Sequence, residues 1–177
     1  MHRDLRPGYH GRVITIGIDP GTATCGFGVV RLEADGGLRM VDAGVVRTPS
    51  NIPEPERLRR LHGALRGLIA EHRPDRVAVE RLFFQRNVQT AMAVGQARGI
   101  ALLAAAEARV PIDEPTPNEI KQQICGSGSA DKAQVATMVE RLLGVRLEGV
   151  PDDATDALAA AIGCAYRGAA EPKAVIG

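Results

Sequence analysis

The order of the short apolar runs along this chain limits it to a few folds. Three runs typical of β-strands come first, and only short connections that contain glycine separate them. These runs are residues 13–18, 26–31 and 38–47. Short glycine-containing connections favour antiparallel hairpins, whereas a strand that is reached through a helix usually runs parallel to its neighbour. The order predicts an α/β fold with a mixed five-stranded sheet, three antiparallel strands plus two parallel, flanked by helices.

Helices and strands alternate in the rest of the chain. Leucine and isoleucine recur at helical spacing over residues 54–72, and Pro74 ends that helix. The strands expected here are 77–82 and 112–114, and the other helices are 87–109, 117–125, 129–143 and 152–167. Ser129 is the expected N-cap of its helix, with Asp131 in the first turn.

Length and composition indicate one ordinary globular domain. The chain has 177 residues, of which 45% are hydrophobic and 24% charged, so a disordered chain and a disulfide-stapled mini-protein are excluded. We expect a flexible N-terminal extension at 1–12, a folded domain at 13–168 and a C-terminal tail at 169–177.

The first residues lack the apolar stretch of a secretory signal, and no run is long enough to span a membrane, so a cytoplasmic location is expected. The three cysteines fit no zinc site and are interpreted as reduced thiols.

The charge balance neither requires nor excludes a nucleic-acid partner. The net charge is +1, which is weak evidence for such a partner. Aromatic residues make up only 3% of the chain, so a sheet that stacks several RNA bases on aromatic side chains is not expected.

Two acidic residues stand where predicted strands end. Asp19 closes the first strand and Glu80 lies near the end of the fourth. If these strands are parallel neighbours, they lie ~4.8 Å apart, and the two carboxylates share the sheet edge at which α/β proteins bind ligands. The alternative is two unrelated acids at solvated strand ends.

A second acidic pair opens the last predicted helix. Asp153 and Asp156 are three residues apart, so they share one helix face. The following residues are small and apolar, which indicates a buried helix. A helix cap explains Asp152 or Asp153 equally well, whereas Asp156 sits a full turn inside the helix. Spacing alone leaves the functional and the structural interpretation of this pair open.

If the four carboxylates gather in one site, that site needs cations. Two carboxylates ~4 Å apart repel by about 4 kcal/mol at an effective dielectric constant near 20. Sites made only of oxygen ligands select magnesium or manganese, and two such ions suit in-line phosphoryl chemistry. The histidines are interpreted as structural or solvated; they are His2, His10, His62 and His72.

Four segments together resemble the RuvC family of Holliday junction resolvases, the crossover junction endodeoxyribonucleases. They are GIDPGTATCGFGVV at 17–30, VERLFFQRNVQTAMAVGQARG at 79–99, GSGSADKAQV at 126–135 and DDATDALA at 152–159. The resemblance covers about residues 13–167. It implies an RNase H-like nuclease domain that acts as a homodimer. It also implies a magnesium-dependent endonuclease that resolves four-way DNA junctions by two symmetric nicks, which leave 5′-phosphate and 3′-hydroxyl ends.

The resemblance also assigns roles to individual residues. The catalytic metal ligands are Asp19, Glu80, Asp153 and Asp156, and the DNA-binding residues are Phe83, Lys121 and Lys132. Two Mg²⁺ ions per subunit are implied, with Mn²⁺ as a possible substitute. The implied partners are four-way junction DNA, a second copy of the chain, and a junction-binding protein and branch-migration motor of the RuvA and RuvB type. No membrane partner is implied.

Several alternatives stay open at this point. Either lysine can be an ordinary solvated residue of its helix, and strand alternation leaves one of Phe83 and Phe84 in the core. The small residues of 87–109 allow close packing against a second subunit or against the sheet; they are Ala91, Gly95, Ala97 and Gly99. The first strand and its turn also fit actin-like ATPases and sugar kinases, although the chain is too short for their second lobe. A catalytically silent junction-binding module is the other alternative.

Overall fold

A computed structural model describes residues 12–81 and 88–170 of the chain. Its strands are β1 (Val13–Asp19), β2 (Thr24–Leu32), β3 (Leu38–Arg47), β4 (Arg76–Val79) and β5 (Ile112–Asp113). Its helices are α1 (Glu54–His72), α2 (Val88–Glu107), α3 (Pro117–Cys125), α4 (Lys132–Leu143) and α5 (Asp152–Ala170). The sheet order is β3-β2-β1-β4-β5, antiparallel across the first three strands and parallel from β1 through β4 to β5. The predicted mixed sheet is therefore confirmed.

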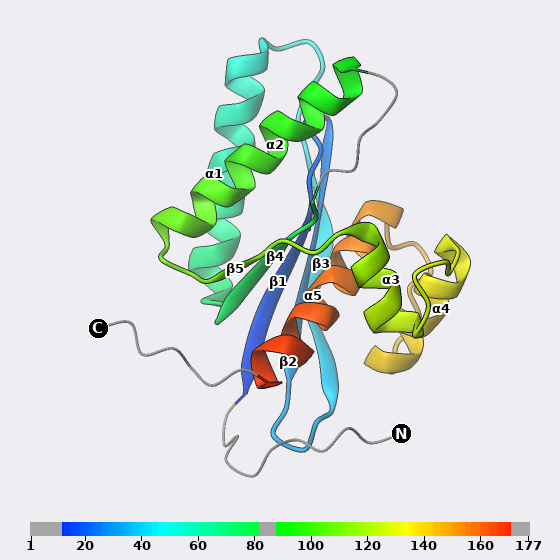
Figure 1. Cartoon of the computed structure of the whole chain (residues 1–177). Coiled ribbons are helices and arrows are strands. Elements are labelled where there is room, and N and C mark those ends of the chain that lie inside the picture. Colours follow the sequence, from blue (N-terminus) through cyan, green and yellow to red (C-terminus); the bar gives the residue numbers. More distant parts are fainter. Residues whose placement is uncertain (1–11, 82–87, 171–177) are drawn as a thin grey trace.

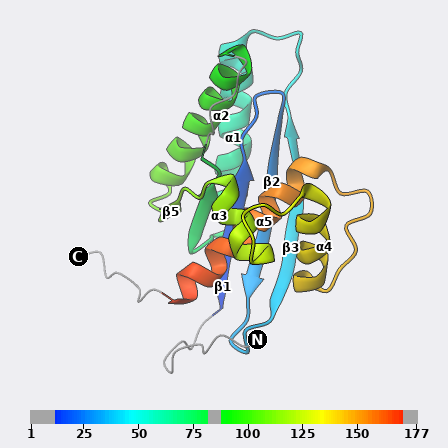
Figure 2. The same cartoon turned by 45° about the vertical axis from the view of Figure 1, so that its right-hand side comes forward.

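Helices cover both faces of this sheet. α1 and α2 pack on one face, and α3, α4 and α5 lie on the other, as Figures 1 and 2 show. Alternation along β1 separates the two cores: Ile16 and Ile18 belong to the core under α1 and α2, whereas Val13 belongs to the core under α5. No helix in the described ranges is long and apolar enough to cross a membrane.

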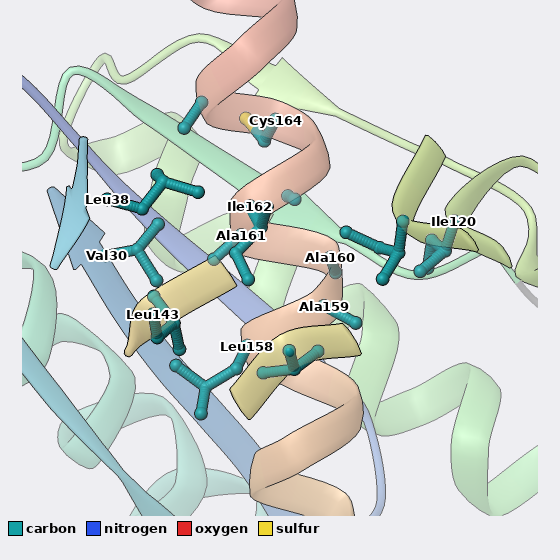
Figure 3. Packing of buried hydrophobic residues seen from close by; sticks show 14 of the residues in the cluster. Val30, Leu38, Ile120, Leu143, Leu158, Ala159, Ala160, Ala161, Ile162 and Cys164 are labelled. Carbon is teal, nitrogen blue, oxygen red and sulfur yellow. The ribbon is translucent and has the colours of Figure 1, made fainter. Parts of the chain in front are cut away.

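α5 lies unusually close to the strands beneath it. A Cβ atom on Gly17 of β1 would stand 1.9 Å from the carbonyl oxygen of Ala157, and one on Gly28 of β2 would stand 2.7 Å from Leu158. The Thr15 hydroxyl also donates a hydrogen bond to the Ala161 carbonyl oxygen, at 2.9 Å. Leu158 and Ala161 lie among the packed side chains of this core in Figure 3. These contacts leave α5 little freedom to slide over the sheet.

Several predicted boundaries need correction. The fourth strand ends at Val79 rather than at 82, because the Arg81 amide already donates to the Pro115 carbonyl; residue 82 lies outside the described residues. The helix predicted from 129 begins at Lys132, because Asp131 is the N-cap. Its carboxylate accepts from the Gln134 amide, while the Gln134 side chain accepts from the Asp131 amide, so this capping box replaces the predicted Ser129 cap.

Candidate active site

Asp19 and Glu80 are neighbours at one edge of the sheet. β1 and β4 run parallel with Ile18 beside Val79, and the Glu80 amide donates to the Ile18 carbonyl oxygen at 3.2 Å. Gly17 and Ala78 face α5, and each acid lies two residues after one of them: Asp19 after Gly17, and Glu80 after Ala78. Since side chains alternate along a strand, both carboxylates belong to the α5 side of the sheet. The predicted pairing of these two strand ends is confirmed.

The first turn of α5 brings the second acidic pair to the same edge. Asp19 pairs across the β1–β2 ladder with Gly26. A Cβ atom on Gly26 would stand 2.0 Å from the Asp153 carbonyl oxygen and 2.9 Å from the Asp153 Cβ. Only glycine at this position lets the helix begin directly above the strand partner of Asp19. Asp156 follows one turn later on the same helix.

Burial, and after it the charges of neighbouring acids, shifts the ionisation of three of these carboxyl groups. Burial, followed by the charges of Glu80, Asp156 and Asp153, raises the pKa of Asp19 to about 7. Burial and the charge of Asp156 raise the pKa of Glu80 to about 7. Burial also raises the pKa of Asp156, although Lys132 acts in the opposite direction. A cluster of carboxylates with raised pKa values at the end of a sheet has the electrostatic character of a functional site.

Lys132 bonds directly to this cluster. Its Nζ lies 3.1 Å from Asp156 Oδ2 and 3.3 Å from Asp152 Oδ2. Lys121, on α3, acts through its charge, and both lysines oppose the rise in the pKa of Glu80. The contact to Asp152 was missed in the sequence, where this residue was interpreted only as a helix cap. Its signal was the four-residue spacing to Asp156, which places both carboxylates on one side of α5.

The chemistry of these residues fits hard divalent cations. The donors are all carboxylate oxygens, the ligand type that magnesium and manganese prefer. Burial and the neighbouring carboxylates raise the pKa values of Asp19 and Glu80, although Lys132 acts in the opposite direction on both. Within residues 12–81 and 88–170, no three histidine, cysteine or acidic side chains are already arranged as a group that could hold an ion. The acids thus lie at one edge with the donor type that such cations prefer, without forming a ready-made coordination shell.

The remaining sequence predictions concern the two phenylalanines, the histidines and the cysteines. Phe83 and Phe84 lie outside the described residues. His62 contacts Glu107 and His72 contacts Asp42, both from α1, which agrees with their structural interpretation. The three cysteines are free, and two of them are buried.

Helix α2 uses its small residues on both sides. Ala97 packs in the core against the sheet and α1, together with Ala101. Gly99 lies on the exposed side. Large apolar side chains stand out on the described surface of this helix: Met92 is 62% exposed and Leu103 is 49% exposed. The alternative of packing against the sheet is therefore present in part of the helix, and an apolar outer surface is left beside it.

Comparison with known proteins points to one family. The family model for crossover junction endodeoxyribonuclease RuvC matches residues 15–164. The chain is 55% identical over 152 residues to the crossover junction endodeoxyribonuclease RuvC of Chloroflexus aggregans. The aligned part covers 85% of this chain and 92% of that relative. The RuvC structure of Thermus thermophilus superposes with a TM-score of 0.80 at 39% identity, over 87% of this chain and 95% of that one. T. thermophilus RuvC in complex with Holliday junction substrate superposes with a TM-score of 0.83 at 37% identity, over 89% of this chain and 96% of that one.

Proposed function

Because the chain belongs to the RuvC family of crossover junction endodeoxyribonucleases, we propose that the carboxylate edge described above is the catalytic centre with which it resolves four-way DNA junctions. The observation that carries this proposal is the convergence of Asp19, Glu80 and the first turn of α5 on one sheet edge. Their ligand roles were inferred from sequence motifs, and the geometry supports them independently.

The proposal assigns divalent cations to these carboxylates. Asp19, Glu80, Asp153 and Asp156 would hold two Mg²⁺ ions per subunit, with Mn²⁺ as an acceptable substitute. When bound, such ions activate water for in-line attack on a phosphodiester and stabilise the leaving 3′-oxygen. The resulting 5′-phosphate and 3′-hydroxyl ends can be sealed by a ligase.

The protein's own part is to hold the acids and to position DNA. Asp19 and Glu80 stand at the ends of hydrogen-bonded strands, so their backbones are rigidly spaced. Lys132, 58% exposed at the site, and Lys121 are assigned to backbone phosphates. Phe83, three residues beyond Glu80, is assigned to the opened junction, where stacking on an unpaired base is worth ~1–3 kcal/mol. We assign the nuclease domain to residues 13–168.

The proposal includes a homodimer formed through α2. Met92, Gly99 and Leu103 are spaced by seven and four residues, which aligns them on one exposed side of the helix. A second copy would cover this apolar surface, and two-fold symmetry matches two symmetric nicks. A junction-binding protein and a branch-migration motor of the RuvA and RuvB type complete the proposed assembly, and a cytoplasmic location goes with this substrate.

Amide substitution of each acid tests the assignment. Asp19→Asn, Glu80→Gln, Asp153→Asn and Asp156→Asn should abolish cutting of a labelled four-way junction in Mg²⁺. Junction binding should persist or tighten in gel-shift assays, because less negative charge faces the phosphates. Glu148→Gln, at an 81% exposed side chain, is the matched control and should cut normally.

The outcomes separate the competing functions. A variant that cuts at the wild-type rate removes that residue from the ligand set. A wild-type protein that binds junctions without cutting them in Mg²⁺ or Mn²⁺ would be the silent binding module instead.

A further inference from the structure

Lys132 occupies an unusual position for a lysine. It is the first residue of α4, where the helix dipole disfavours a positive side chain. Ion pairs with two carboxylates of α5 offset this unfavourable interaction: the ammonium group lies 3.1 Å from Asp156 and 3.3 Å from Asp152. The location of this charge is therefore decided by α5 rather than by its own helix.

The two carboxylates that share the ammonium group differ in their surroundings. Asp156 belongs to the acidic edge, its side chain is 31% exposed, and it is one of the four proposed metal ligands. Asp152 lies one helical turn earlier, is 81% exposed and is outside that set. The ammonium group thus contacts one proposed metal ligand, Asp156, and one carboxylate outside the proposed ligand set, Asp152.

An ammonium group and a divalent cation compete for the same carboxylate. Both are attracted by the negative charge of Asp156, and they repel each other when they are bound to it together. Asp152 offers the displaced ammonium group a partner within its present reach, so displacement does not leave the lysine unpaired.

We propose that the Lys132 ammonium group and a divalent cation are alternative partners of Asp156, with Asp152 as the positioning residue that retains the ammonium group when the cation binds. The inference rests on the proposed function, because it takes Asp156 as a metal ligand. It adds a regulation of that site: the lysine limits charge repulsion in the metal-free protein and lowers its affinity for the cation. Released from Asp156, the ammonium group faces the incoming phosphate.

The test measures Mg²⁺ binding calorimetrically on the full chain without DNA, so that cleavage plays no part. Lys132→Gln should bind Mg²⁺ about fivefold more tightly, a coupling of ordinary size between two ligands. In EDTA, Lys132→Gln should also melt at a lower temperature than the wild type. Without metal, the lysine ammonium group offsets the repulsion among the acids, and this variant lacks it. Lys132→Arg keeps the charge and should bind Mg²⁺ as the wild type does. Lys121→Gln removes a nearby charge that also acts on Glu80 and should change Mg²⁺ affinity less than Lys132→Gln.

Asp152 is tested through a double-mutant cycle. Asp152→Asn should weaken Mg²⁺ binding in the wild-type background, because Lys132 then has only Asp156 as a partner. In the Lys132→Gln background the same change should have a much smaller effect, since the carboxylate acts through the lysine. Equal effects in both backgrounds would show that Asp152 acts by its charge alone and would overturn its positioning role.

Failure of the inference is distinguishable from failure of the proposed function. If Lys132→Gln binds Mg²⁺ with wild-type or weaker affinity while Asp156→Asn abolishes binding, the site holds metal but the competition is refuted. If Asp156→Asn and Asp19→Asn bind Mg²⁺ like the wild type, the metal site itself is wrong. Lys132→Met repeats the measurement with an uncharged side chain of similar length, should Lys132→Gln be unstable.

Discussion

Replacing Gly26 by alanine should displace Asp153 from its position above strand β2 and slow cleavage. The added methyl group would start 2.0 Å from the Asp153 carbonyl oxygen, whereas ordinary contacts of a Cβ atom begin at 3.4 Å. The start of α5 and strand β2 must therefore separate by about 1.4 Å, with backbone on both sides of the contact. Overpacking of this kind costs ~1–3 kcal/mol of folding free energy. Misplacement of a catalytic group by ~1 Å can cost ~10²-fold in rate.

The assay is single-turnover cleavage of a labelled four-way junction in Mg²⁺, with urea unfolding of the same preparation. Gly26→Ala should cut about a hundredfold more slowly at temperatures where it is fully folded. The matched control is Gly63→Ala on α1, where an added Cβ meets nothing within 4 Å. It should cut normally and gain ~0.5–1 kcal/mol of stability, because alanine is the better helix former. Wild-type cutting by folded Gly26→Ala would refute the argument that this glycine sets the position of Asp153.

Two further predictions concern stability and assembly. Asp113 accepts hydrogen bonds from Arg76 at 2.7 Å and Cys164 at 2.9 Å; burial opposes its charge, but these bonds lower its pKa overall. Asp113→Asn should therefore cost ~2 kcal/mol at pH 7. Urea unfolding should show this difference shrinking as pH falls below ~4, the ordinary pKa of the carboxyl, and vanishing once pH passes the lowered pKa of the folded protein. Met92→Glu should convert the dimer into a monomer in sedimentation equilibrium at micromolar concentration, whereas Val41→Glu, on the 42% exposed Val41 of β3, should not. A Met92→Glu variant that stays dimeric would exclude this side of α2 from the interface.

Local patterns predicted the elements because their causes act over a few residues. Alternating apolar residues and glycine turns predicted β1 to β3, and Pro74 predicted the end of α1. These signals are local, because side chains alternate along any strand and proline cannot continue a helix. The error at the start of α4 had the same origin. Ser129 and Asp131 both cap well, and the reciprocal bond from Gln134 decides between them.

Chain order indicated the acidic edge only conditionally. Strands that run parallel end on the same side of a sheet, so the sequence indicates that Asp19 and Glu80 share an edge if their strands are neighbours. The sheet order decides that condition, because β1 and β4 pair directly. Asp153 and Asp156 were predicted to share a helix face, but not how closely that face approaches the sheet. That distance depends on Gly17, Gly26 and Gly28, whose missing side chains have no periodic signature strong enough to interpret alone.

The pairing of Lys132 with Asp152 and Asp156 was decided only by the tertiary structure. α4 and α5 are separate helices, and no local preference of either one specifies the position of the other. Their positions follow from burial of one apolar core, in which Val139 and Leu143 of α4 pack with Leu158 and Ile162 of α5. Because that burial sums many weak, non-directional contacts, it can be located only when the whole chain is folded. The sequence by itself determined which charged groups exist and which strands carry them, and core packing decided which of those charges meet.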